Sequence, residues 1–126
     1  MFRTVPQLTV RDLAVAAEFY TSRLGFTATQ LDPPENPVFA ALDREEASLF
    51  LVSESSREEV NQQELAANCR GVGVRLYFEV DDARAAYDSL RAAGVRILRD
   101  IAFNEAENYT EFSLLDPDGY EIGIYS

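Results

Sequence analysis

The sequence predicts an α+β fold built from two copies of a βαβββ module. Two patterns support this prediction: alternating apolar and polar residues mark short strands, and the same order of strand and helix signals occurs twice. The composition agrees, because 126 residues that are 47% hydrophobic suit one compact domain with an apolar core. We expect a single domain over residues 1–126, with module 1 at about 1–54, a linker at 55–70 and module 2 at about 71–126.

The first module is expected to open with a strand at Phe2–Val10, in which Leu8 and Val10 alternate with polar residues. Asp12 has the side chain of a helix N-cap, and apolar residues then recur every three or four positions until Gly25 ends the helix. The other predicted elements are strands Phe26–Leu31 and Val38–Leu42, a hairpin loop Asp43–Glu46, and strand Ala47–Ser53.

The second module repeats this order after Ser55–Asn68, a polar and acidic stretch that is either a short exposed helix or a flexible linker. The clearest strand signal in the chain is the alternation of Val74, Leu76, Phe78 and Val80 with polar or amphipathic residues. We expect these four side chains to pack against a helix. The other predicted elements are a helix capped by Asp82 and ended by Gly94, strands Val95–Ile101, Asn108–Leu115 and Tyr120–Tyr125, and a turn Asp116–Gly119.

Charge and residue usage exclude several function classes. The formal net charge of −11 argues against nucleic acid and anionic membranes as partners, because both bind basic surfaces. The chain has no histidine, so Ser-His-Asp and Cys-His relays and imidazole metal ligands are excluded. A nucleophilic role for Cys69 would need an activating base, so we expect an inert thiol. No signal-peptide or membrane-spanning pattern is present, and we expect a cytoplasmic protein.

Three motifs in order carry a family resemblance over nearly the whole chain. They are Leu8–Leu13 with Glu18–Tyr20 and Leu24–Phe26, then Tyr77–Asp82 with Ala92–Val95, and finally Glu111–Tyr120. On these residues the chain resembles the glyoxalase/bleomycin-resistance/dioxygenase superfamily, also called vicinal oxygen chelate proteins. The resemblance implies paired βαβββ modules that form a curved mixed sheet around a cup, commonly in a homodimer.

The resemblance also locates the positions that hold a metal ion in metal-dependent members of the superfamily. In this chain those positions are Val5, Phe50, Arg75 and Gly123. None of these residues can ligate a divalent ion through its side chain, although Glu121 lies only two residues from Gly123. We therefore expect no metal ion and no other cofactor.

Strand alternation predicts which side chains line the cup. The candidate ligand-binding residues are Gln7, Thr9, Phe50, Val52, Arg75, Tyr77, Glu79, Glu121 and Tyr125. Arg75 either binds a ligand anion or pairs with Glu79 or Glu121. Phe50 and the two tyrosines either contact a ligand or fill a core. The parity of Asn108–Leu115 stays open, so Tyr109 and Phe112 are further candidates.

Two classes of function fit this sequence. The first is metal-independent binding of a small aromatic or cationic molecule, including sequestration of an antibiotic or toxic compound. The alternative is a lyase, isomerase or dioxygenase-type enzyme that uses carboxylates, with Glu79 and Glu121 as candidate acid–base residues, or a carboxylate site for a hard cation. A third reading is that the acidic stretch Glu54–Glu64 contacts another chain, although a solvated surface also explains it.

Overall fold

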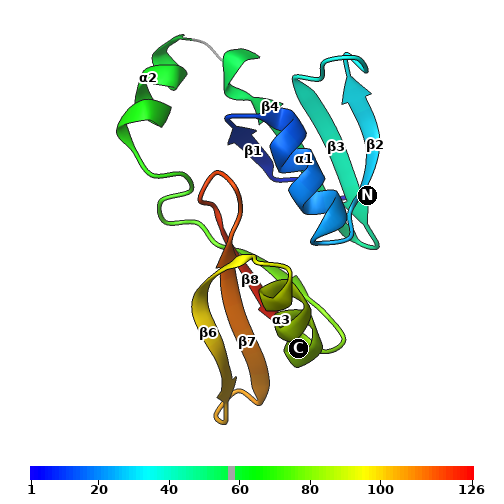
Figure 1. Ribbon diagram of the computed structural model, residues 1–126, viewed down its shortest axis with the longest axis vertical. Coiled ribbons are helices and arrows are strands. Elements are labelled where there is room, and N and C mark those ends of the chain that lie inside the picture. The colour runs from blue at the N-terminus through cyan, green and yellow to red at the C-terminus, as the bar shows by residue number, and fades with distance from the viewer. Residues whose placement is uncertain (57–58) are drawn as a thin grey trace. The chain divides into compact units, whose positions relative to one another are not determined.

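The computed structural model describes residues 1–56 and 59–126. It divides into two compact units, Met1–Asn68 and Cys69–Ser126. Each unit contains one four-stranded mixed sheet with a helix packed on one of its faces (Figure 1). The predicted α+β fold of two βαβββ modules is thereby confirmed. No helix among the described residues is long and apolar enough to cross a membrane.

The first unit has the strand order β1-β4-β3-β2. Strand β1 runs parallel to β4, whereas β3 is antiparallel to both of its neighbours. The single parallel pair arises because the chain crosses over through a helix before it returns to the sheet. The elements are β1 (Gln7–Val10), α1 (Leu13–Ser22), β2 (Thr27–Asp32), β3 (Phe39–Arg44) and β4 (Ala47–Ser53).

The core of this unit lies between the sheet and α1. Alternate residues of β1 and β4, such as Val10 and Leu51, are fully buried, as is Tyr20 of α1. The helix begins where the sequence predicts, because the Asp12 carboxylate accepts a hydrogen bond from the backbone N–H of Val15 at 3.2 Å. The strand faces and the helix start therefore follow local sequence.

The polar stretch Ser55–Asn68 is largely helical. A 3-10 turn, η1, covers Glu54–Ser56, and α2 covers Glu59–Ala67. Of the two readings of this stretch, the structure favours the short helix. Arg57 and Glu58 of the predicted acidic surface lie outside the described residues.

The second unit repeats the topology with the strand order β5-β8-β7-β6, and β5 runs parallel to β8. Its core packs Tyr87 and Leu90 of the helix against Phe112, Leu114 and Ile122 of the sheet. The elements are β5 (Leu76–Glu79), α3 (Ala83–Ala92), β6 (Arg96–Asn104), β7 (Tyr109–Leu115) and β8 (Glu121–Tyr125). Asp82 caps α3 as predicted, since its carboxylate accepts from the Ala85 N–H at 3.0 Å.

The turn between β7 and β8 is held by a buried carboxylate. Asp116 is 1% exposed, and its Oδ1 accepts hydrogen bonds from the backbone N–H groups of Asp118 and Tyr120, each at 2.9 Å. Gly119 adopts a φ of +95°, which an L side chain rarely accommodates. The predicted turn therefore forms, and it fixes the register of the two strands that carry the site below.

Two strands begin two or more residues later than predicted. The first strand begins at Gln7 rather than Phe2, because Pro6 has no N–H to donate to the ladder; its carbonyl accepts from Phe50. The strand predicted from Val74 begins at Leu76 instead. Val74 donates its N–H to Gly71 within a local turn and is 59% exposed, so it does not pack against the helix.

Candidate functional site

The face of the second sheet opposite α3 carries the predicted polar and aromatic residues. Phe112 points toward α3, where its ring centre lies 5.2 Å from that of Tyr87. Because side chains alternate along a strand, Tyr109, Glu111 and Ser113 of β7 lie on the other face. Of the two residues whose orientation the sequence did not settle, Tyr109 therefore lies on the face opposite α3, and Phe112 lies on the face that packs against α3. We call the face opposite α3 the open face of the second sheet.

Strand register arranges the open face in rows across β5, β8 and β7. One row contains Tyr77, Gly123 and Ser113. The next contains Glu79, Tyr125 and Glu111. Neighbours in a row lie on adjacent strands, about 4.8 Å apart. The rows therefore bring together side chains that are far apart in the sequence.

An ion cluster lies at one end of this face. Arg75 Nε lies 2.6 Å from Glu121 Oε2, and Arg99 Nε lies 3.5 Å from the same oxygen. Arg75 also donates from Nη1 to the Tyr77 hydroxyl at 2.9 Å. This hydrogen bond and the Glu121 carboxylate raise the pKa of Arg75 above its ordinary value. Of the two glutamates predicted as partners of Arg75, Glu121 forms the ion pair and Glu79 does not.

Three tyrosine rings continue from this cluster across the face. The ring centre of Tyr125 lies 6.0 Å from that of Tyr77 and 6.3 Å from that of Tyr109, in edge-to-face geometry. Tyr77 is 44% exposed, so packing against the protein leaves part of its side chain in contact with solvent. Such rings offer flat apolar surface with a polar edge, which is suited to a flat ligand or a cation.

Gly123 lies directly beneath the Tyr77 ring. A Cβ atom at this position would lie 2.5 Å from Tyr77 Cε1, closer than real side chains approach. The absence of a side chain at 123 therefore allows the ring to lie flat on the sheet. Beside Gly123, Ser113 is 2% exposed, and its hydroxyl has no hydrogen-bond partner among the described residues.

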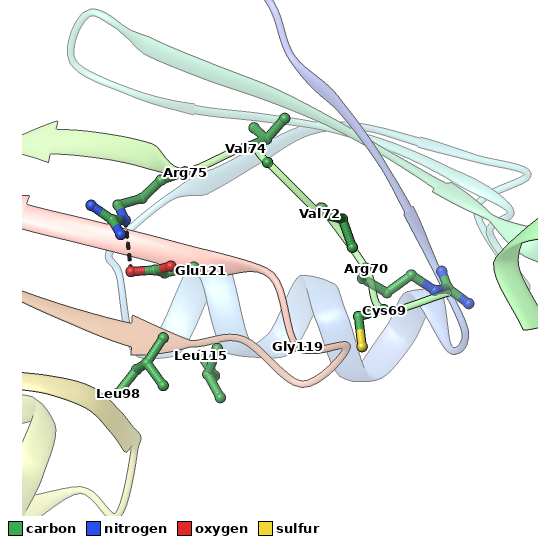
Figure 2. Close-up of a pocket in the computed structure, with 11 residues that line it drawn as sticks. Cys69, Arg70, Val72, Val74, Arg75, Leu98, Leu115, Gly119 and Glu121 are labelled. Atoms are coloured by element: carbon green, nitrogen blue, oxygen red, sulfur yellow. Dashed lines mark ion pairs between the residues drawn. The ribbon is translucent and has the colours of Figure 1, made fainter. Parts of the chain in front are cut away.

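A pocket of ≈ 490 Å³ adjoins the ion cluster. Figure 2 shows the Arg75–Glu121 ion pair at one end of the pocket and Cys69 with Arg70 at the other. The Cys69 thiol is free and the residue is exposed. The lining residues are Cys69, Arg70, Gly71, Val72, Gly73, Val74, Arg75, Leu98, Leu115, Gly119 and Glu121.

The other predicted ligand-binding residues lie together on the first sheet. Gln7 is paired with Phe50, and Thr9 with Val52, on the face opposite α1. Phe39 joins them, with its ring centre 5.2 Å from that of Phe50. The sequence analysis did not identify Phe39. Residues of this strand alternate between the two faces of the sheet, and Leu42 is buried, so the alternation could have placed Phe39 on the opposite face.

Sequence reasoning also missed three residues of the second sheet. Arg99, Glu111 and Ser113 lie on the open face beside the predicted Tyr77, Glu79, Glu121 and Tyr125. Glu111 and Ser113 follow once the parity of β7 is known, because they alternate with Phe112. Arg99 carries no such signal, because the β6–β7 register is irregular on both sides of it.

The four residues that the family resemblance aligned with metal ligands do not fit a divalent ion. Val5 and Phe50 have hydrocarbon side chains, Arg75 is a cation paired with Glu121, and Gly123 is covered by Tyr77. Within residues 1–56 and 59–126, no group of three or more Cys, Asp or Glu side chains is placed to hold a metal.

Comparisons with known proteins agree with this fold. A family model described as the Glyoxalase/Bleomycin resistance protein/Dioxygenase superfamily matches residues 4–124. The search of curated proteins returned no match.

Among solved structures, TioX from Micromonospora sp. ML1 is 16% identical, with a TM-score of 0.78 over 99% of this chain and 98% of that chain. A member of the superfamily from Sphaerobacter thermophilus DSM 20745 is 19% identical, with a TM-score of 0.74 over 99% and 96%. An integron cassette protein from the mobile metagenome of V. cholerae is 24% identical, with a TM-score of 0.70 over 99% and 96%. At these identities the likeness shows a shared fold.

Proposed function

This chain belongs to the Glyoxalase/Bleomycin resistance protein/Dioxygenase superfamily, and we propose that it binds a small aromatic or cationic molecule without a metal ion. The binding surface in this proposal is the open face of the second sheet, and the biological role is sequestration. One observation carries the proposal: the tyrosine rings of this face lie in contact with one another, yet Tyr77 stays 44% exposed.

The tyrosine rings of the open face, of which Tyr77 is exposed and Tyr125 half-buried, differ from the rings that build the cores of the two units. Tyr20 and Tyr87 pack beneath their helices and are 0% and 4% exposed. Tyr77 and Tyr125 lie on the opposite face of their sheet and add nothing to the α3 core. Covering solvent-exposed aromatic surface with a flat ligand is favourable, because it removes apolar surface from water. This contrast supports ligand contact over core filling for the two tyrosines.

The same geometry supports the proposed independence from a metal ion. The Tyr77 ring covers Gly123, and Arg75 occupies a second position that holds a ligand in metal-dependent members. A guanidinium repels a divalent cation, and a tyrosine ring leaves no room beside residue 123. Glu121 retains a carboxylate, but two arginines already contact it.

A thermal-shift screen of the full chain tests this proposal. The panel contains divalent metals, aromatic antibiotics, organic cations and small carboxylates. A ligand present at about 100 times its dissociation constant adds about 2.7 kcal/mol, which raises the melting temperature by several degrees. We expect a rise with aromatic or cationic compounds and none with metals. A rise with a metal alone would overturn the proposal and favour the enzyme alternative.

Two variants connect any binding to the proposed face. Tyr77→Ala removes an exposed ring from the open face and should weaken the shift. Phe103→Ala is the matched control, because Phe103 is also exposed, at 58%, but lies on the other face of the sheet. Phe103 is paired with Thr110, and Thr110 points to the same face as Phe112, toward the helix. Equal losses in the two variants would place the ligand elsewhere.

A further inference from the structure

Two glutamates flank Tyr125 on the open face of the second sheet. Strand register pairs Tyr125 with Glu79 of β5 on one side and with Glu111 of β7 on the other. From the usual strand spacing, the two glutamate Cα atoms lie about 10 Å apart, with the tyrosine between them. An aromatic ring with a carboxylate on either side is an arrangement that favours a positive charge above the ring.

Neither glutamate has its charge compensated within the described part of the chain. Glu121 on the same face contacts Arg75 and Arg99, whereas Glu79 and Glu111 form no ion pair with a described residue. Glu79 is exposed and Glu111 is half-buried, so neither residue is enclosed in the core. The open face is therefore polarised, with arginines at one end and uncompensated carboxylates at the other.

One of the three tyrosine rings of this face already contacts a cationic side chain of the protein. The Arg75 guanidinium carbon lies 5.7 Å from the centre of the Tyr77 ring. The ring centre of Tyr125 lies 6.0 Å from that of Tyr77, and no described arginine lies over the Tyr125 ring within the same contact distance. The ring that has carboxylates on both sides is thus the ring without a cation of its own.

A buried hydroxyl provides an independent indication of a ligand. Ser113 lies on the open face, one row from Tyr125 and two residues from Glu111 on the same strand. It is 2% exposed, and its Oγ has no hydrogen-bond partner among the described residues. A buried hydroxyl without a partner lowers stability, so a polar group of a ligand that reaches it would be bound favourably.

We propose that Tyr125, Glu79 and Glu111 form a subsite for an organic cation, namely a protonated amine or a quaternary ammonium group carried by a flat ring. The inference rests on the proposed function and specifies its ligand class and orientation. The ring of the ligand lies along Tyr77 and Tyr125, and its cationic group lies between the two glutamates. A polar substituent on the ring reaches toward Ser113. The net charge of −11 attracts such a ligand at long range.

Two isosteric probes and one anionic probe test the charge requirement. They are meta-hydroxyphenyltrimethylammonium, its neutral isostere meta-tert-butylphenol, and the anion meta-hydroxybenzoate. Dissociation constants are measured with the full chain by isothermal titration calorimetry at low and at moderate salt. We expect the cation to bind about tenfold more tightly than the neutral isostere, with the difference shrinking as salt is added.

Single substitutions locate the charge. Glu79→Gln and Glu111→Gln should each weaken binding of the cation by about two- to fivefold, and should leave binding of the neutral isostere unchanged. Asp88→Asn is the matched control, because it removes the same charge from α3 on the other side of the sheet. The melting temperatures of all three variants show whether folding is retained.

The outcomes separate this inference from the proposed function. Equal binding of the cation and the neutral isostere overturns the cation subsite and leaves aromatic binding intact. Binding of the anion alone does the same and moves recognition to Arg75. A Glu79→Gln effect no larger than that of Asp88→Asn also overturns the subsite. If none of the probes and no compound of the thermal-shift panel binds, both proposals fail.

Discussion

Replacing Gly123 with alanine perturbs the tyrosine row at one defined point. The added Cβ would lie 2.5 Å from Cε1 and 2.6 Å from Cδ1 of Tyr77, so the ring cannot stay where it is. The backbone itself does not resist the change, because Gly123 is not among the residues with positive φ. Tyr77 lies on the edge strand β5 and is 44% exposed, so its side chain can rotate toward solvent.

The cost of this rotation can be estimated from the contacts that are lost. The edge-to-face contact with Tyr125 is worth about 0.5–1.5 kcal/mol, and the hydrogen bond from Arg75 about as much. Alanine in a strand recovers about 0.5–1 kcal/mol relative to glycine. We therefore expect Gly123→Ala to lower the free energy of unfolding by about 1 kcal/mol, within a range of about 0–2.5 kcal/mol.

Urea denaturation followed by circular dichroism measures this change, and a double-mutant cycle identifies its cause. In a Tyr77→Ala background the steric conflict is gone, so Gly123→Ala should be neutral or should stabilise by up to about 1 kcal/mol. Gly123→Ala should also weaken the binding of any ligand that contacts the Tyr77 and Tyr125 rings. A loss of stability of equal size in both backgrounds would refute the argument that the Tyr77 ring occupies this space.

Further predictions concern the carboxylates outside the site. Asp116→Ala leaves two backbone N–H groups without their acceptor and should cost about 2–4 kcal/mol by urea denaturation, whereas Asp116→Asn keeps an acceptor oxygen and should cost less. The hydrogen bond from Tyr87 holds the pKa of Asp100 below its usual value. A carboxylate with a lowered folded-state pKa stabilises the fold above its unfolded-state pKa, about 3.9, and this stabilisation is lost as the pH falls through the folded-state value. The stability advantage of the wild type over Asp100→Asn should therefore shrink as the pH falls below about 5 and through the folded-state pKa; a constant difference would contradict the assignment. The same contact raises the pKa of Tyr87, so Asp100→Asn should move the alkaline absorbance titration of that tyrosine to lower pH.

Several features of the fold could be predicted because the signals are local. Asp12 and Asp82 begin their helices as expected, since an N-cap is a contact between a side chain and a backbone N–H three residues away. The buried faces of β1, β4 and β8 follow apolar alternation, as Leu51 and Ile122 show. The prediction that Val74 lies in the strand was wrong, because the alternating apolar pattern continues into a turn that the neighbouring glycines form.

Part of the candidate site could be predicted in the same way. Parity alone placed Arg75, Tyr77, Glu79, Glu121 and Tyr125 on one face of the second sheet. Parity could not select between Glu79 and Glu121 as the partner of Arg75, because that choice depends on how β5 is aligned with β8. The structure pairs Arg75 with Glu121 and leaves Glu79 beside Tyr125.

The sequence by itself therefore determined the two βαβββ modules, their helix caps and the faces of most strands. Only the tertiary structure decided that Glu79 and Glu111 flank Tyr125, that Tyr77 lies on Gly123, and that Ser113 is buried beside it. The physical reason is that alternation and capping act between residues close in the chain. Cross-strand neighbours are set instead by the register of segments that are distant in sequence, which no local pattern encodes.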